Sequence, residues 1–541
     1  MILATIHFFL FFTICFGNGS ILFSILNIKE RFNVYEITLI GLIITGLIAQ
    51  LLNFFIPLNN SLIISNFFII ILFFTFNNFI KFKDIFIRKF NKIIILILIV
   101  ILFNIWCSDF HDDLNHYHYS YILNTDYTKY IFGYNFFHNL YGFSSGWLIL
   151  QSYFNFDYSR LQDIHVINAL ILFLVLCIFI SHFNEIKKKE NIKILDIIFF
   201  SILLFVILKY TRLKEFGLDK PATLIFFYII FLSFKNEIFD KKLNNANLFI
   251  ILLLSFFIIY IKIIYIPILI LPVLNILKFK NYGFLFTKYC NILILVNISY
   301  FAKNIIISGC LVYPVQQLCF ENLTWINLNS IQELGIGIEV FNKSYSNYNG
   351  SLSKIEYIQN FNWIATWFLR NFKEFTNIIL LIILCFLIPV LISKRKYKKS
   401  NKDIINLTGV LIFCFLSFIL FLKSPVIRMY HHLFVFIILV CSIYLFKNFT
   451  FKINKKFIFI LTIALVFNFS KNFIRIHKAD YNNDHFGKII QLGWYTKSIK
   501  SNIGQFEYYI GWYDKAVAGQ DLNKLKLKYR KTLLNYDMIY K

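Results

Sequence analysis

The chain has 541 residues, of which 58% are hydrophobic and only 15% are charged, and its mean hydropathy is +0.67. Apolar runs of about 15 to 22 residues, separated by short polar segments, exclude a soluble globular fold and are typical of membrane-spanning helices. The net charge of +26 does not indicate nucleic-acid binding, because Lys and Arg gather in short loops between the apolar runs, as the positive-inside rule describes.

The first half of the chain is expected to contribute seven helices, assigned from the hydrophobic runs and oriented by the Lys and Arg content of the loops. Loops at Lys81–Lys92 and Lys187–Lys189 are strongly basic and are expected in the cytoplasm, which places Asp109–Gly146 outside. Residues 1–16 lack a basic start and a small-residue cleavage site, so we expect a retained first helix rather than a removable signal peptide. The expected helices cover residues 2–26, 36–56, 62–80, 93–106, 164–183, 194–210 and 222–234.

A run of 30 residues from Leu248 to Leu277 has basic loops at both ends, so both ends are expected inside. The chain must then turn back near Lys262 and Pro267, which predicts two short helices with Lys262 at or near the outer surface. The basic loop Lys394–Lys402 is again expected in the cytoplasm. The predicted fold class is an all-α integral membrane protein, a polytopic bundle of about 12–14 transmembrane helices. The remaining helices are expected over residues 289–307, 377–392, 404–422, 431–446 and 457–470.

These elements divide the chain into three parts. Residues 1–92 form N-terminal transmembrane helices, residues 93–470 form a transmembrane core with outer loops at 107–162 and 308–376, and residues 471–541 form a polar tail expected outside. The nine cysteines are scattered, mostly in apolar runs and without a CxxC pair, which is typical of small buried side chains. Cys310 and Cys319 flank an outer segment, and the sequence leaves open whether they pair.

Acidic residues and histidines are scarce elsewhere but gather directly after the helix expected at 93–106. A carboxylate at the membrane edge takes the proton of an acceptor hydroxyl or holds a divalent metal, so the candidate catalytic residues are Asp109, Asp112 and Asp113. On a helix, Asp112 shares a face with His116, and Asp113 with Tyr117. Asp113 and His116 are the candidate metal ligands, although their spacing is not diagnostic of a metal site. The alternative interpretation is that these are ordinary solvated residues at a helix end.

Cationic side chains gather on the same expected face and suit a substrate that carries a phosphate or pyrophosphate. Lys262 lies in an apolar run, where snorkelling to the surface is the alternative explanation, and Arg428 equally fits an interfacial anchor. The sequence contains no Gly-rich phosphate loop, no GxSxG and no HExxH motif. The candidate cations are Lys262, Lys303, Lys423 and Arg428.

Four motifs follow one another along the chain. They are Asp-Leu-Asn-His-Tyr-His at 113–118 with Tyr-Gly-Phe-Ser-Ser-Gly-Trp at 141–147, Gly-Leu-Asp-Lys-Pro-Ala at 217–222, Asn-Ile-Ile-Ile-Ser-Gly-Cys-Leu-Val-Tyr-Pro at 304–314, and Phe-Leu-Lys-Ser-Pro-Val-Ile-Arg-Met at 421–429. In this order they resemble the motifs of a large bacterial family of uncharacterised polytopic membrane proteins, which are similar to GT-C-type glycosyltransferases. The resemblance spans about residues 93–445. Three departures are Met429, where an aromatic residue is usual, Leu422, which replaces part of an aromatic pair, and the three helices that precede the acidic loop where the usual glycosyltransferase has one.

The resemblance implies a GT-C-like enzyme in the bacterial cytoplasmic (inner) membrane. It would transfer a sugar from a polyprenyl-phosphate-linked donor to a glycan, lipid or protein acceptor of the cell envelope, on the outer face of the bilayer. Asp113 would be the base or a metal ligand and Asp219 a second carboxylate, and the sequence leaves open whether Mg²⁺ or Mn²⁺ takes part. The implied substrate-binding residues are Tyr117, His118, Lys262, Lys303, Tyr313, Lys423 and Arg428.

Two other functions remain open at this point. An O-antigen-polymerase-like ligase would join oligosaccharides carried on pyrophosphate lipids, and it also has large outer loops with essential arginines. A non-enzymatic transporter or flippase should place ionisable residues near the middle of the bilayer. The clustering of these residues at one membrane edge favours chemistry at the surface.

Overall fold

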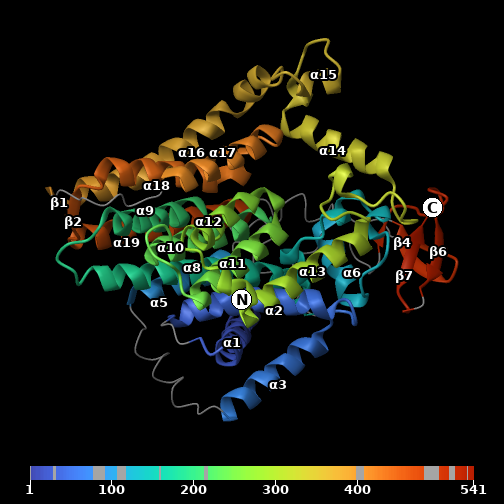
Figure 1. Cartoon of the computed structure of the whole chain (residues 1–541), viewed down its shortest axis with the longest axis horizontal. Coiled ribbons are helices and arrows are strands. Elements are labelled where there is room, and N and C mark those ends of the chain that lie inside the picture. Colours follow the sequence, from blue (N-terminus) through green and yellow to red (C-terminus); the bar gives the residue numbers. More distant parts are fainter. Residues whose placement is uncertain are drawn as a thin grey trace.

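The computed structural model describes residues 2–28, 32–76, 92–106, 117–156, 160–211, 217–397, 407–480, 499–510, 518–532 and 534–540. They form a helical bundle (Figure 1). Among these residues, seven helices are long and apolar enough to cross a membrane, and several shorter apolar helices accompany them. The chain is therefore a multi-pass membrane protein, and the finer prediction of 12–14 spans stays a prediction.

The first half of the chain follows the predicted helices closely, with ends that shift by a few residues. One addition is that the predicted outer loop contains two short helices, α6 (Tyr119–Tyr127) and α7 (Gly146–Tyr153). α8 is the most enclosed of the seven long apolar helices, with 94% of its apolar stretch buried. The helices are α1 (Ile2–Ile25), α2 (Val34–Leu52), α3 (Asn60–Phe76), α5 (Lys92–Trp106), α8 (Arg160–Ile186), α9 (Ile194–Lys209) and α10 (Asp219–Lys235).

The predicted reversal at Lys262 is confirmed. α11 (Asn245–Ile261) ends there, because the backbone of Lys262 is extended, with φ −150° and ψ 124°. A 3₁₀ segment, η4 (Ile263–Leu269), makes the turn, and α12 (Ile270–Lys278) returns beside the start of α11. The side chain of Asn275 proves the return, since it donates to the Lys241 carbonyl at 2.8 Å and accepts from the Leu243 amide at 3.2 Å.

The second half holds two corrections to helix boundaries. The helix predicted from about 377 begins at Ile364, because polar residues such as Arg370 and Lys373 extend the helix beyond its apolar run. The last helix likewise continues beyond 470, to Asp480. The helices are α13 (Lys288–Ser308), α14 (Leu328–Asn342), α15 (Lys354–Ile358), α16 (Ile364–Ile392), α17 (Leu407–Lys423), α18 (His431–Phe446) and α19 (Lys455–Asp480).

The two ends of the bundle carry different structures (Figure 1). At one end, β1 (Lys394–Tyr397) pairs antiparallel with β2 (Phe449–Lys452). At the opposite end lie α6 and the C-terminal strands (Figure 1). Those strands are β3 (Ile499–Ile503), β4 (Phe506–Ile510), β5 (Ala518–Gly519), β6 (Lys528–Lys531) and β7 (Asp537–Tyr540), with β3-β4-β5 in one sheet and β6-β7 in a second.

The C-terminal strands dock on the segment between α6 and α7. The Phe132 amide donates to the Asp537 carbonyl at 3.0 Å, and the Ile539 amide donates back to the Phe132 carbonyl at 3.0 Å. Gln520 adds a third backbone contact, because its amide donates to the Phe137 carbonyl at 2.8 Å. The described part of the tail is thus a folded β module fixed to the end of the bundle that carries α6.

Cys310 and Cys319 form a disulfide, which answers the question that the sequence left open. The bridge closes the segment that follows α13. Backbone hydrogen bonds flank it, from the Leu311 amide to the Leu318 carbonyl at 2.8 Å and from the Phe320 amide to the Gly309 carbonyl at 2.9 Å. The closed loop contains Tyr313, whose side chain is buried.

Candidate functional site

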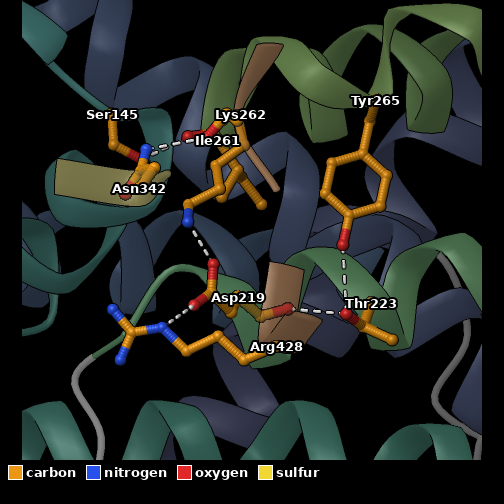
Figure 2. Close-up of polar contacts among 9 residues, drawn as sticks. Ser145, Asp219, Thr223, Ile261, Lys262, Tyr265, Asn342 and Arg428 are labelled. Carbon is orange, nitrogen blue, oxygen red and sulfur yellow. Dashed lines mark hydrogen bonds and ion pairs between the residues drawn. The ribbon is translucent and has the colours of Figure 1, made fainter. Parts of the chain in front are cut away.

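Asp219 is the centre of a charged cluster drawn from three separate parts of the chain (Figure 2). It is the first residue of α10, Lys262 follows α11, and Arg428 lies in the 3₁₀ turn η8 (Ile427–Tyr430). Lys262 Nζ pairs with one carboxylate oxygen of Asp219, and Arg428 Nε lies 3.4 Å from the other. Arg428 is 44% exposed, whereas Asp219 is 13% exposed, so the cluster opens on the arginine side.

Local structure explains why these three residues meet. A carboxylate in the first turn of a helix is stabilised by the positive end of the helix dipole, which suits Asp219. Thr223, one turn later, donates its hydroxyl to the Asp219 carbonyl at 2.8 Å and lies 3.0 Å from the Tyr265 hydroxyl (Figure 2). Tyr265 belongs to η4, so this buried contact holds the turn after Lys262 against the start of α10.

The Asp219 carboxyl stays ionised in this setting. Burial raises its pKa, but the charges of Lys262 and Arg428 lower it by more, so the net pKa lies below the usual value. A carboxylate whose pKa is lowered is a weak general base at neutral pH. The geometry therefore suits Asp219 for holding the two cations in place rather than for taking a proton.

A cavity of about 450 Å³ lies beside the cluster. Its size falls in the range of small-molecule binding sites. Most of its wall is apolar, and among the described residues that line it, Lys262 is the only charged one. The polar lining residues are Tyr117, Tyr121, Ser144, Ser145, Tyr260, Lys262, Tyr300, Asn304, Tyr313, Asn342 and Ser424.

Two of the sequence motifs meet at the cavity wall. Lys303 Nζ donates to the Ser144 carbonyl at 2.5 Å, and the Ser144 hydroxyl donates to Asn304 Oδ1 at 3.0 Å. The neighbouring Ser145 hydroxyl donates to the Ile261 carbonyl at 3.3 Å, next to Lys262. α13 thereby fixes the segment 142–146, and this segment in turn contacts the end of α11.

Gly142 is required at this wall for close approach. A Cβ atom at Gly142 would lie 2.6 Å from the ring of Tyr313, closer than packed atoms allow. The disulfide loop can therefore lay Tyr313 directly on the segment 142–146 only because position 142 has no side chain. The motif Tyr-Gly-Phe-Ser-Ser-Gly-Trp thus packs against the disulfide loop and also lines the cavity.

α14 covers the cavity and is tied to the segment that leads to Arg428. Its lining residues are Leu334, Gly337, Ile338, Phe341 and Asn342. Glu339 of α14 pairs with Lys423 at the end of α17. It also pairs with Lys343, whose Nζ lies 2.6 Å from Glu339 Oε1. Asn342 also donates to the Ser424 hydroxyl at 2.8 Å.

The structure brings together four of the predicted substrate-binding residues and the predicted second carboxylate, Asp219. Tyr117, Lys262 and Tyr313 line the cavity, and Asp219 and Arg428 join Lys262. The remaining predicted catalytic and metal residues Asp109, Asp112, Asp113 and His116 lie outside the described residues.

Four predicted substrate-binding residues do not line the cavity: Arg428, which lies beside it in the charged cluster, and Lys303, His118 and Lys423. Lys303 is buried, with its Nζ on the Ser144 carbonyl and 4.7 Å from the Tyr300 ring centre, and it is absent from the cavity wall. His118 is also buried, with its ring 4.2 Å from that of Tyr117. Lys423 is 72% exposed and pairs with Glu339.

Within the described ranges, no group of three or more His, Cys, Asp or Glu side chains is placed to hold a metal ion. The suggested ligands Asp113 and His116 fall outside those ranges, so a role for Mg²⁺ or Mn²⁺ stays a prediction.

Sequence reasoning missed several residues of the wall. Tyr260 and Tyr300 lie within apolar helices, where an aromatic residue has the same pattern as one that packs against lipid. Asn342 and Ser424 come from polar segments with no distinctive motif of their own. Ser144 and Asn304 had a signal, since both belong to motifs singled out above.

Comparison with known proteins gives a family and no function. Residues 1–436 match the family model described as Domain of unknown function (DUF8201). This range includes the charged cluster and every residue that lines the cavity. No curated protein and no solved structure matches the chain. Because the match covers most of its length, the chain belongs to the DUF8201 family.

Proposed function

We propose that this protein is a GT-C-like glycosyltransferase that moves a sugar from a polyprenyl-phosphate-linked donor to an acceptor of the cell envelope. The observation that carries the proposal is the meeting of Lys262 and Arg428 at the edge of a largely apolar cavity. A lipid-linked sugar phosphate needs both features, since its phosphate requires cations and its chain requires an apolar surface.

The charge balance of the cluster supports an anionic ligand. Two cations and one carboxylate leave a net charge of +1 beside the cavity. Asp219 holds Lys262 and Arg428 at fixed positions before the ligand arrives, which lowers the ordering cost of binding. In the transfer step the same cations would stabilise the negative charge that grows on the departing phosphate.

The acidic stretch supplies the proposed base. Asp113 precedes Tyr117 by four residues in the sequence, and Tyr117 lines the cavity. A carboxylate of Asp113, or of Asp109 or Asp112, would take the proton of the acceptor hydroxyl. The acceptor oxygen then bonds to the anomeric carbon, and the bond from that carbon to the phosphate oxygen breaks, leaving its electron pair on the phosphate. Asp113 and His116 are the proposed ligands if Mg²⁺ or Mn²⁺ takes part.

The proposed reaction takes place on the outer face of the bacterial cytoplasmic membrane. The disulfide between Cys310 and Cys319 supports this side, because disulfides persist in oxidising compartments. The basic strand Lys394–Tyr397 lies at the other end of the bundle, as the positive-inside rule requires for a cytoplasmic end (Figure 1).

A transporter or flippase is the second candidate, and one buried contact between a histidine and an aspartate favours it. His7 of α1 pairs with Asp163 of α8, and both side chains are buried. Ionisable residues inside a membrane bundle are costly and often lie on transport pathways. Movement of a labelled lipid across proteoliposomes without sugar transfer would support this candidate over the enzyme.

Sugar transfer in membranes tests the proposal. Membranes that contain the full chain would receive a polyprenyl-phosphate donor with a labelled sugar, and incorporation into envelope acceptors would be measured. Arg428→Ala and Lys262→Met should each reduce transfer roughly 10- to 100-fold, as expected for losing a charged hydrogen bond. Lys241→Met is the matched control, because it breaks an exposed ion pair with Glu237 beyond the other end of α10. Full transfer by both site variants, at normal protein levels, would contradict the proposal.

A further inference from the structure

One face of α14 is turned toward the cavity. Leu334, Ile338 and Asn342 follow one another at intervals of four residues, and Gly337 and Phe341 lie between them, so the five share a face of the helix. This face is about 12 Å long, since a helix rises about 1.5 Å per residue. Phe341 is 70% exposed although it lines the cavity, so the protein covers only part of its ring. The apolar part of this face is therefore accessible to a ligand.

α14 lies at the edge of the bundle rather than inside it (Figure 1). It packs mainly against segments that are close to it in the sequence, namely α15 and the turns η6 (Gln316–Leu318) and η7 (Tyr345–Asn347). Its ties to α17 and the segment after it are polar, through Glu339 to Lys423 and through Asn342 to Ser424. α14 is thus held over the cavity by its flanks, which leaves its apolar face available.

Gly337 is not explained by the packing of the protein. Glycine is among the poorest helix formers, yet Gly337 lies within α14, where the backbone is helical. Within the part of the chain that the structure describes, a Cβ atom at this position would meet no atom within 4 Å outside its own stretch of the helix. By contrast, a Cβ atom at Gly142 would lie 2.6 Å from the Tyr313 ring. A glycine that faces a cavity lets a ligand approach the backbone closely, which a larger side chain would prevent.

The same face of α14 leads to the charged cluster. Asn342, at its end, donates to the Ser424 hydroxyl at 2.8 Å. Ser424 precedes Arg428 by four residues, and Lys262 lines the cavity itself. Gly337 lies five residues before Asn342, about 7.5 Å along the helix axis. A molecule with its phosphate at the two cations can therefore extend along α14 to Gly337.

We propose that α14 is the wall on which the isoprenoid chain of the donor lies, and that Gly337 leaves the space for this chain beside the phosphate at Lys262 and Arg428. The inference rests on the proposed function and adds the place of the lipid chain and a limit on its size. An isoprenoid chain carries a methyl branch on every unit, and the missing side chain at position 337 leaves room for such a branch. A single branched chain fits this helix face better than the two chains of a bilayer phospholipid.

Binding of undecaprenyl phosphate to the purified full chain in detergent micelles tests this role. Gly337→Leu places a side chain in the proposed path, so the affinity should fall roughly 10-fold or more, and Gly337→Ala should cause a smaller loss. Both replacements are better helix formers than glycine, so the melting temperature should not fall. Dioleoyl phosphatidic acid is the second probe, and the wild type should bind it more weakly than undecaprenyl phosphate.

Gly283→Leu is the matched control. A Cβ atom at Gly283 also meets no described atom within 4 Å, and Gly283 is not among the described residues that line the cavity, so the affinity should stay unchanged. Three results would overturn the inference and leave the proposed function standing: wild-type affinity in Gly337→Leu, a loss of affinity accompanied by a lower melting temperature, or a wild type that binds phosphatidic acid at least as tightly as undecaprenyl phosphate. If the wild type does not bind undecaprenyl phosphate, the proposed function itself fails.

Discussion

Asp219 and Lys262 are 43 residues apart in the sequence, yet they form an ion pair between the start of α10 and the end of α11. The pair stands at the edge of the cavity, and Arg428 joins it from a third segment. The reversal of the chain at Lys262 is what makes the site, because a continuous helix would carry this lysine away from Asp219.

Asp219→Asn should weaken donor binding more than turnover. The amide keeps the shape but leaves two cations side by side without their anion, so Lys262 and Arg428 lose their fixed positions. We expect KM for the lipid donor to rise roughly 10-fold and the free energy of unfolding to fall by roughly 1–3 kcal/mol. Steady-state kinetics and thermal unfolding measure the two effects. Asp219→Glu retains the charge and should lose less, and an unaltered KM in Asp219→Asn would show that the carboxylate does not position the cations.

The same residue predicts how stability depends on pH. The folded-state pKa of Asp219 lies below its usual value, so its ion pairs stabilise the fold at pH values above the unfolded pKa of about 3.9. That stabilisation is lost as the pH falls through the folded-state pKa. The difference in melting temperature between wild type and Asp219→Asn should be constant from pH 7 to about pH 5 and shrink on further acidification. A difference that vanishes already between pH 7 and pH 6 would contradict this ionisation.

Arg428→Lys should separate charge from geometry. Lysine keeps the positive charge but loses the planar fork that grips two phosphate oxygens. We expect the Kd of a polyprenyl phosphate to rise roughly 5- to 10-fold, with a smaller change in kcat. Arg428→Ala should be worse than Arg428→Lys. If Arg428→Lys and Arg428→Ala lowered kcat equally and left the Kd of the polyprenyl phosphate unchanged, Arg428 would have a role other than phosphate binding.

Asp113→Asn tests the base predicted from the sequence. The change removes basicity and most metal affinity while keeping the size of the side chain, so sugar transfer should fall roughly 100-fold or more. Binding of the lipid donor should stay close to that of the wild type. Full activity of this variant at normal protein levels would move the role to Asp109 or Asp112, and full activity with all three aspartates replaced would favour the transporter.

The disulfide should contribute to stability through the loop that it closes. The double replacement Cys310→Ser with Cys319→Ser should lower the free energy of unfolding by roughly 2–4 kcal/mol and loosen the contact of Tyr313 with Gly142. Thermal unfolding of the full chain in detergent measures the change. Cys441→Ser is the control, because Cys441 is an exposed free cysteine. Identical melting curves for the wild type with and without reductant would rule out a stabilising bridge.

The main helices were predictable because an apolar run long enough to cross a membrane rarely forms any other structure. The reversal at Lys262 was predictable too, since basic loops at both ends of one run demand it. The residues of the cavity wall were not predictable, because Tyr260 and Tyr300 have the same sequence pattern as aromatic residues that face lipid. Lys303 shows a further limit: a lysine near the end of an apolar helix can face solvent or a buried carbonyl, and only the fold shows Ser144 beside it.

The location of a bound lipid phosphate tests the central claim most directly. A cryo-electron microscopy structure of the full chain with a polyprenyl phosphate should show its phosphate about 2.7–3.2 Å from donor atoms of both Lys262 and Arg428, with the lipid chain against the apolar wall of the cavity. A phosphate bound elsewhere on the bundle, with Lys262 and Arg428 still paired to Asp219 and the cavity empty, would contradict the account.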